Sequence, residues 1–232
     1  MFDQIISYLE MCEAEGSQQL QKGMNFNISP KYSVILMSQR SNAHYKDKIL
    51  KDGKTIEYEG HDEPKRGYEH NPKYEDQPRY LATGKLTENG KFIEAIDLYK
   101  NGTEEPRLIK VYEKIISGVW SLKGFFDLIG YRIENDGKRN VYIFTLRLSP
   151  HSSNYLPMIE NSSDILQTRL IPSIVKRKVW ERDKGRCVIC GSKINLHFDH
   201  DLPFSKGGSS ATEHNIRILC ATCNLRKSNK IE

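Results

Sequence analysis

The sequence of 232 residues has no long hydrophobic run. Its longest, Val34–Met37, is far shorter than the ~20 apolar residues that a membrane-spanning helix needs. The first residues lack a basic segment followed by a hydrophobic core, which is the pattern of a secretory signal. With 16 glycines, 9 prolines and 28% charged residues, the composition excludes collagen-like, low-complexity and wholly disordered chains. We therefore expect an intracellular, cytoplasmic protein without a membrane partner, long enough for two domains.

The net charge of the whole chain is small, at +5. Residues 171–232, however, hold 12 Lys+Arg against 6 Asp+Glu, a net charge of +6. The other 170 residues hold 23 against 24, a net charge of −1. A basic C-terminal quarter is typical of a segment that meets phosphate, and a solvated basic tail is the alternative.

Cysteine is scarce, and four of the five residues form two Cys-x-x-Cys pairs, Cys187 with Cys190 and Cys220 with Cys223. In a chain without a secretion signal, this spacing favours a metal site over disulfides. Two such pairs can close a tetrahedron of thiolates around one structural Zn²⁺ per chain. We interpret the fifth, Cys12, as a small packed hydrophobic residue.

Short β-like runs separated by turn residues dominate the first two thirds of the chain. An amphipathic helix is expected before them over residues 2–12, where Phe2, Ile5, Ile6 and Leu9 have helical spacing. Many short strands with little helix between them predict a barrel or a strongly bent sheet. The expected strands are Tyr32–Met37, Thr55–Tyr58, Phe92–Leu98, Leu108–Ile116, Phe125–Tyr131 and Val141–Leu148.

Polar segments suggest the domain boundaries. Residues 63–79 contain three prolines and predict a long exposed loop. A stretch rich in Ser and Asn predicts a linker over residues 156–170, and Pro172 begins a helix that ends by Gly185. The expected organisation is an N-terminal helical segment over 1–25, a sheet-rich domain over 26–155, the linker, and a C-terminal domain over 171–232.

Polar motifs surround the two cysteine pairs. They are Arg182-Asp183, Asp199-His200, Gly207-Gly208, Asn215 and Asn224. Asn215 follows His200 by 15 residues, and Asn224 follows Asn215 by 9. With these motifs, residues 171–232 resemble an HNH endonuclease, which implies a zinc-stapled ββα-metal fold.

Hydrolysis of a phosphodiester needs a deprotonated water and stabilisation of the charge on the phosphate. His200 is the natural general base, because the pKa of histidine lies near neutrality. The resemblance implies that Asn215 orients this imidazole through an amide contact. It also implies that Asp199 and Asn224 offer oxygen ligands to one catalytic Mg²⁺ or Mn²⁺. Phosphate contacts, or ordinary solvated charges, are expected at Lys206, Arg226 and Lys227.

A zinc ribbon without catalysis is the alternative, with His200 as a zinc ligand or a core residue. Four cysteines already complete the zinc tetrahedron, and a ribbon does not require the Asp199-His200 pair with both asparagines. A zinc deaminase is disfavoured, because the sequence has no Pro-Cys-x-x-Cys motif: Arg186 and Leu219 precede the two cysteine pairs.

A second set of motifs lies in the first 155 residues. They are Tyr32–Leu36, Tyr45–Asp47, Ile56–Gly60, Asp76-Gln77, Thr87–Lys91, Pro106–Val111, Gly118–Trp120, Gly124–Leu128 and Val141–Leu146. Together they resemble an SRA-like (SET-and-RING-associated, PUA-superfold) domain, which implies a bent β-barrel that flips a modified cytosine out of duplex DNA. The family's Tyr-Asp-Gly signature is replaced here by Leu122-Lys123-Gly124.

A flipped base needs aromatic faces on both sides and polar groups for its Watson–Crick edge. We assign Tyr45 and Tyr58 as the stacking pair and Asp47 as the acceptor for the cytosine amino group. The alternative is structural, since a strand tyrosine usually packs against neighbouring strands and an exposed Asp is usually solvated.

The favoured function is that of a prokaryotic, modification-dependent restriction endonuclease of the α+β class. It would read 5-methylcytosine, or another 5-substituted cytosine, in double-stranded DNA and hydrolyse a nearby phosphodiester bond. The alternatives are an HNH endonuclease for an unmodified sequence and a non-catalytic DNA-modification sensor with a zinc ribbon. Because one active site cuts one strand, a double-strand break implies a homodimer or two engaged copies.

Overall fold

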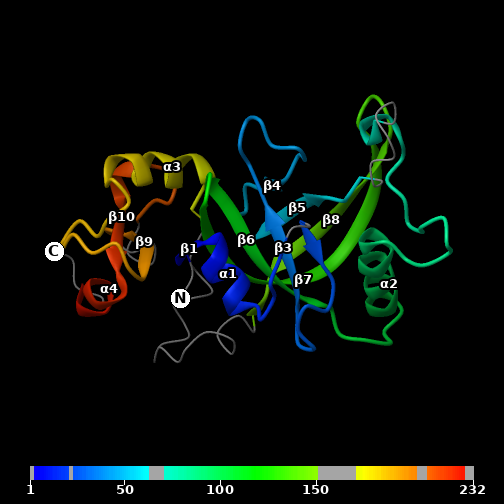
Figure 1. The fold of residues 1–232 in the computed structure, drawn as a ribbon, viewed down its shortest axis with the longest axis horizontal. Coiled ribbons are helices and arrows are strands. Elements are labelled where there is room, and N and C mark those ends of the chain that lie inside the picture. The colour runs from blue at the N-terminus through cyan, green and yellow to red at the C-terminus, as the bar shows by residue number, and fades with distance from the viewer. Residues whose placement is uncertain (1–2, 21–22, 63–70, 151–170, 203–207, 228–232) are drawn as a thin grey trace.

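The computed structural model of the chain describes residues 3–20, 23–62, 71–150, 171–202 and 208–227. A long curved sheet forms one part of the molecule, and a small hairpin with two helices forms the other (Figure 1). The elements are β1 (Ile5–Ser7), α1 (Tyr8–Ala14), β2 (Met24–Asn25), β3 (Ser33–Met37), β4 (Lys48–Ile49), β5 (Thr55–Glu59), η1 (Pro72–Tyr74), α2 (Glu88–Lys100), β6 (Leu108–Ile116), β7 (Val119–Asn135), β8 (Asn140–Leu148), α3 (Ser173–Arg182), β9 (Leu196–His200), η5 (Glu213–Asn215), β10 (Ile216–Cys220) and α4 (Ala221–Lys227).

The large sheet has eight strands, and its main path runs in the order β2-β3-β6-β7-β8-β5-β4, with β1 added to β7. Only the β3–β6 pair in this sheet is parallel among the described strands. The path is open, because the end strands β2 and β4 do not pair with each other in the described residues. The predicted α+β class is therefore confirmed, whereas the expected barrel is a bent sheet that does not close.

The bend is built into the long strand β7. Its first half pairs with β6 and its second half with β8, and register shifts interrupt both pairings. Gly124 has a φ of +120°, a conformation that residues with a side chain rarely adopt, and it lies opposite one of these shifts. The ribbon of β7 and β8 accordingly curves over its whole length (Figure 1).

Helix α2 contradicts the predicted strand Phe92–Leu98. The Thr87 side chain accepts a hydrogen bond from the Gly90 N–H at 3.1 Å and caps the helix. Phe92, Ile93 and Ile96 then share one buried face, which is helical spacing. The prediction was wrong because a short apolar run does not distinguish a strand from a buried helix face.

The N-terminal helix predicted over residues 2–12 is also wrong at its start. Residues 5–7 form strand β1, which pairs with β7, and α1 begins only after Ser7. Ser7 and Glu10 form a reciprocal capping box at that point. Cys12 is 5% exposed in a cluster with Met11 and Trp120, so its interpretation as a packed residue is confirmed.

The remaining predicted elements are recovered as β3, β5, β6, β7, β8 and α3. The predicted linker over 156–170 and residues 63–70 of the predicted loop lie outside the described residues. Within the described ranges, no helix is long and apolar enough to cross a membrane.

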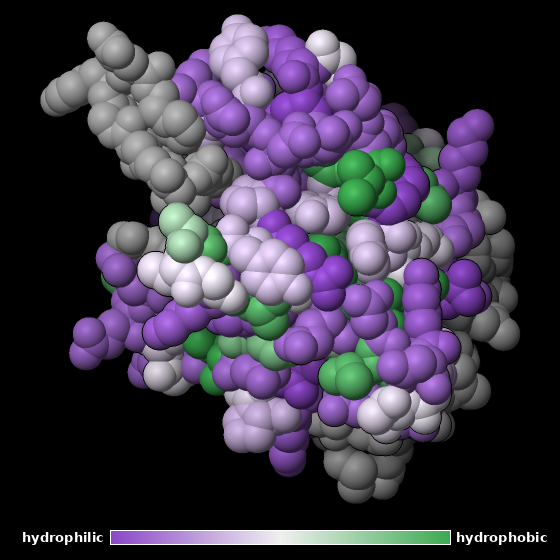
Figure 2. Space-filling view, turned by 90° about the vertical axis from the view of Figure 1, so that its right-hand side faces the viewer, coloured by the Kyte–Doolittle hydropathy of each residue, from purple (hydrophilic) through white to green (hydrophobic). Residues whose placement is uncertain are grey.

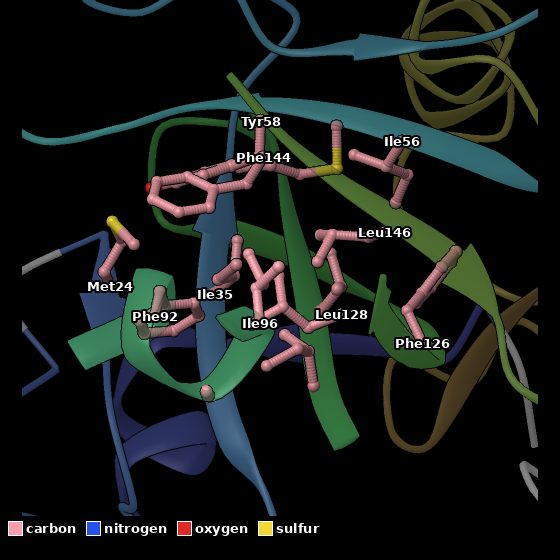
Figure 3. Packing of buried hydrophobic residues seen from close by; sticks show 14 of the residues in the cluster. Met24, Ile35, Ile56, Tyr58, Phe92, Ile96, Phe126, Leu128, Phe144 and Leu146 are labelled. Carbon is pink, nitrogen blue, oxygen red and sulfur yellow. The ribbon is translucent and has the colours of Figure 1, made fainter. Parts of the chain in front are cut away.

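The core of the N-terminal part lies between the sheet and α2. In Figure 3, apolar side chains from β3, β5, β7, β8 and α2 point toward one another. A separate cluster of buried residues forms the core of the C-terminal part. Residues of β1, β6 and β7 also pack into this cluster. The two parts therefore share buried contacts.

Candidate nuclease centre and base pocket

The hairpin β9–β10 carries the HNH motifs. His200 lies opposite Ile216 and Asp199 opposite Arg217 in its antiparallel register. The hairpin is held to α3 by the Arg182-Asp183 motif. The Asp183 carboxylate accepts from the Ile218 N–H at 2.9 Å, and Arg182 donates to the Ile216 carbonyl at 2.7 Å. This motif therefore fixes β10 against the helix.

The four clustered cysteines converge as predicted. The Sγ atoms of Cys187, Cys190, Cys220 and Cys223 all lie within 4.8 Å of one another, and those of Cys190 and Cys220 are 3.6 Å apart. A tetrahedral site with Zn–S bonds of about 2.3 Å places its sulfurs about 3.8 Å apart. Burial raises the pKa of the Cys187 thiol, but N–H groups of its own turn and of Cys220 outweigh this and lower it to about 6. The cluster fits a structural Zn²⁺.

His200 is half-buried at the end of β9. Its Nε2 lies 2.7 Å from the hydroxyl oxygen of the buried Ser210. Burial lowers the pKa of His200, an effect that the Asp3 and Asp199 carboxylates oppose. The imidazole is therefore predominantly neutral at neutral pH, which is the state that a general base requires. Ser210 has no signal in the sequence, because its contact depends on how the loop before Asn215 returns to the hairpin.

Asp199 already has a cation beside it. The Lys227 ammonium donates to the Asp199 carboxylate at 2.6 Å and to the His200 carbonyl, and the lysine is 4% exposed. Asn224 lies three residues earlier on α4, on the same helical face, and α4 packs against β9. A buried cation at this carboxylate shows that the position accommodates positive charge, and Asp199 and Asn224 are the residues that could hold a divalent ion of the Mg²⁺ type.

Asn215 has different partners from those implied by the resemblance. Its side-chain oxygen accepts from the Leu202 N–H at 2.7 Å, and its amide donates to the carbonyls of Leu202 and Ser209, each at 3.0 Å. These bonds go to the backbone of the loop after His200 and not to the imidazole. Gly208 belongs to the same loop, where a Cβ would lie 1.8 Å from the Leu202 carbonyl oxygen. Asn215 and Gly208 therefore shape this loop.

The three expected phosphate contacts are placed differently from one another. Lys206 lies outside the described residues. Arg226 is exposed on α4. Lys227 is buried against Asp199, so in this structure it neutralises a carboxylate instead of facing solvent.

Of the predicted base-pocket residues, Tyr45 and Asp47 lie in the chain segment between β3 and β5, and Tyr58 lies within β5. Each carboxylate oxygen of the buried Asp47 accepts a backbone N–H, from Ser38 at 2.8 Å and from Glu59 at 3.3 Å. Burial raises the pKa of Asp47 to about 7. The Tyr45 ring is partly buried and stacks on the His61 ring, with centroids 5.9 Å apart and planes inclined by 21°.

Tyr58 is a core residue, as the structural alternative holds. It is 1% exposed, pairs across strands with Phe144 and belongs to the cluster of Figure 3. Its hydroxyl is buried without a hydrogen-bond partner among the described residues. A Cβ on Gly23 would approach this hydroxyl to 2.5 Å and the His61 Nε2 to 2.9 Å, so a glycine is needed beside the pocket.

A polar network around His61 was not predicted from the sequence. The Asn89 amide bonds both the His61 N–H and the His61 carbonyl, each at 2.8 Å. Gln77 donates to the Gly60 carbonyl at 2.7 Å, and the fully buried Arg139 side chain reaches Asp62. These contacts join α2, the segment after η1 and the residue before β8 to the segment after β5. Figure 2 shows that this end of the molecule is mainly hydrophilic, with hydrophobic residues in small separate groups.

Comparisons with known proteins agree with the C-terminal geometry. Residues 187–230 match the sequence model of the HNH endonuclease family. A search of curated proteins finds no match.

Solved structures resemble longer parts of the chain. A SUVH5 SRA domain in complex with hemi-methylated CG DNA shares 19% identity at a TM-score of 0.44, over 68% of this chain and 93% of that one. Arabidopsis thaliana SUVH6 in complex with SAM shares 17% at 0.42, over 71% and 28%. The type IV phosphorothioation-dependent restriction endonuclease ScoMcrA shares 15% at 0.42, over 98% and 55%. TM-scores below 0.5 do not decide the fold. The family match coincides with the cysteine cluster and the β9–β10 hairpin, so residues 187–230 of this chain are similar to the HNH endonuclease family.

Proposed function

We propose that the protein is a modification-dependent restriction endonuclease. Its N-terminal part would bind double-stranded DNA that contains 5-methylcytosine or another 5-substituted cytosine and flip the modified base. Its HNH part would hydrolyse a phosphodiester bond nearby. The observation that carries the proposal is the Asp199-His200 pair on β9, held in a cysteine-framed hairpin that matches the HNH family.

His200 acts as the general base in this proposal. Because Nε2 is held by Ser210, we assign Nδ1 as the nitrogen that takes the proton from the attacking water. The lowered pKa keeps this nitrogen available near neutral pH. Asn215 contributes by holding the backbone of the loop that follows His200.

Asp199 and Asn224 would hold one divalent ion, which supplies charge stabilisation at the phosphate when it is bound. Lys227 would then leave the Asp199 carboxylate, and with Arg226 it would contact the DNA backbone. The four-cysteine site has no open position in this proposal and serves the fold.

Base recognition is assigned to the pocket around Asp47. Its carboxylate would accept a hydrogen bond from the cytosine amino group, and the Tyr45 ring would stack on the base. Two features support this assignment: the Asp47 carboxylate is buried and fixed by the Ser38 and Glu59 N–H groups, and the Tyr45 ring two residues earlier stacks on His61. Tyr58 is a residue of the core in this proposal and does not contact the base.

Digestion of matched duplexes with and without 5-methylcytosine, in Mg²⁺ or EDTA, tests the proposal. We expect cleavage only of the modified duplex and only with the metal. Equal cleavage of both duplexes would indicate an HNH enzyme for an unmodified sequence. Binding of modified DNA without cleavage, under any divalent metal, would indicate a sensor.

A double-strand break needs two active sites, so we propose that two copies act together on one site. The ratio of nicked to linear plasmid at increasing protein concentration measures this. A linear product that forms at the same rate as the nicked product, whatever the protein concentration, would contradict the joint action of two copies.

A further inference from the structure

Asp3 lies where the two parts of the chain meet. Its N–H donates to the Leu122 carbonyl in β7 at 2.7 Å, and its carbonyl accepts from the Phe198 N–H in β9 at 3.1 Å. Phe198 directly precedes the Asp199-His200 pair, so this bond holds the strand that carries the nuclease centre. A residue at the start of the chain thus connects the large sheet to the HNH hairpin.

Four buried charges surround this connection, and we call them the interdomain ion cluster: Asp3, Glu113, Lys123 and Lys176. Lys176 on α3 pairs with Asp3 and lies 3.7 Å from Glu113 on β6, which in turn lies 2.9 Å from Lys123 on β7. The side chains of Glu113, Lys123 and Lys176 have no exposed surface, and that of Asp3 is 6% exposed. The cluster is balanced, with two charges of each sign.

Further bonds extend from the cluster into both parts. Lys123 donates to the Ile171 carbonyl just before α3 at 2.9 Å, and Lys176 donates to the Ser121 hydroxyl in β7 at 2.8 Å. Ser173 in the first turn of α3 donates to Glu113. Every one of these contacts joins α3, or Ile171 in the segment just before it, to the sheet.

The apolar contacts around the cluster also cross the boundary. Ile115 belongs to the core cluster of the C-terminal part, and Ile5, Ile116 and Val119 pack against it. Rotation of the hairpin against the sheet would therefore expose apolar surface and separate buried opposite charges, both of which are costly.

We propose that Asp3 is a positioning residue that holds strand β9 in one orientation on the N-terminal sheet, so that cleavage falls at a fixed distance from the recognised base. The inference rests on the proposed function for its effect on DNA. A nuclease on a flexible tether would reach many phosphates and leave a spread of cut positions. A nuclease fixed through buried contacts reaches few phosphates and leaves a narrow set of cut positions.

Two variants test the role of Asp3. Asp3→Asn keeps the shape of the side chain but leaves the buried cluster with one unbalanced positive charge. Asp3→Asn combined with Lys176→Met removes both charges of one pair and leaves the Glu113–Lys123 pair, so it avoids an unpaired buried charge if the single variant fails to fold. Glu134→Gln is the matched control, because it also converts a carboxylate to an amide but in the exposed pair with Arg132.

Pulsed dipolar spectroscopy on the free protein measures the orientation without DNA. Spin labels on non-natural amino acids at the exposed positions 94 and 193 report the distance from α2 to the loop before β9. We expect a narrow distance distribution in the wild type and the control, and a broad or shifted one in the cluster variants. Zinc content and the affinity for modified DNA should stay unchanged, since neither site includes Asp3.

Mapping of cut positions on a duplex with one 5-methylcytosine gives the effect on DNA. We expect the wild-type positions to form a narrow set and those of the cluster variants to spread. Folded variants with wild-type distance distributions and cut positions would overturn the positioning role. If the wild type ignores the modification, the proposed function fails, while the distance measurement still decides the role of Asp3.

Discussion

Acidification should reduce the preference of this protein for modified DNA, because the acceptor assigned to the flipped cytosine has a raised pKa. Burial raises the pKa of Asp47 from its ordinary 3.8 to about 7, and the Glu59 and Glu113 carboxylates add to the rise. Only the ionised carboxylate has both oxygens available as acceptors. A pKa near 7 means that about 90% of the side chain is ionised at pH 8 and about 10% at pH 6.

The ratio of Kd for unmodified DNA to Kd for modified DNA should therefore fall about ten-fold from pH 8 to pH 6. Fluorescence anisotropy with matched duplexes measures this ratio, in which pH effects on shared phosphate contacts cancel. Asp47→Asn should give a low ratio at both pH values.

Asp52→Asn is the control, since Asp52 remains ionised over this range. Burial acts to raise the pKa of Asp52, but hydrogen bonds from Thr55 and Lys54 lower it overall. This variant should keep the wild-type pH dependence. A pH-independent ratio in the wild type, or an unchanged slope in Asp47→Asn, would refute the assignment of Asp47 to the base.

The same raised pKa affects the stability of the fold. Because the folded state holds the proton on Asp47 more tightly than the unfolded state, this group stabilises the fold below about pH 4 and loses that contribution as pH rises to about 7. The difference from 3.8 corresponds to on the order of 4 kcal/mol. Urea denaturation at pH 5 and pH 8 should show a smaller loss of stability with rising pH in Asp47→Asn than in the wild type, and equal losses would contradict the raised pKa.

Further predictions concern the core, the catalytic base with its metal ligand, and the zinc. Tyr58→Ala should cost about 3–5 kcal/mol of stability, and its affinity loss should be equal on modified and unmodified DNA. Tyr58→Phe should be neutral or stabilising by about 1 kcal/mol, because it removes a buried hydroxyl without a partner among the described residues. A loss of affinity in Tyr58→Ala that is confined to modified DNA would show that Tyr58 contributes to the base pocket. His200→Ala should lose roughly 10²–10⁴-fold in cleavage with zinc and DNA binding intact, and the wild-type rate should fall with acidity only below the ordinary pKa of histidine, since burial lowers that of His200. The loss of cleavage in Asn224→Ala should become smaller as the concentration of Mg²⁺ or Mn²⁺ is raised, whereas the loss in His200→Ala should not. Rescue of His200→Ala but not of Asn224→Ala by the metal would contradict both assigned roles. Metal analysis should find one zinc per chain held by the four clustered cysteines, a site worth on the order of 10 kcal/mol of folding free energy, so a zinc-free protein with an unchanged melting curve would contradict the assignment.

Features with a local cause could be predicted from the sequence. The first Cys-x-x-Cys pair lies on a tight turn, and the second spans the end of β10 and the first turn of α4. Each arrangement is local and holds its two thiols near one another wherever it lies in a fold. The alternation of Tyr142, Phe144 and Leu146 marks β8, because successive strand residues face opposite sides of a sheet. The position of Asp199-His200 between the pairs likewise indicated the nuclease hairpin, since the family motif is contiguous in sequence.

Contacts between distant residues were decided only by the tertiary structure. The apolar run from Phe92 is helical because its face packs on the sheet, and residues 5–7 form a strand because β7 offers an edge there. Burial changed the meaning of Tyr58 and Lys227, whose local sequence suggested a stacking face and a phosphate contact. Asp3 meets Lys176 across 173 residues of chain. No local pattern encodes such a pair, because its energy depends on burial that only the assembled fold provides.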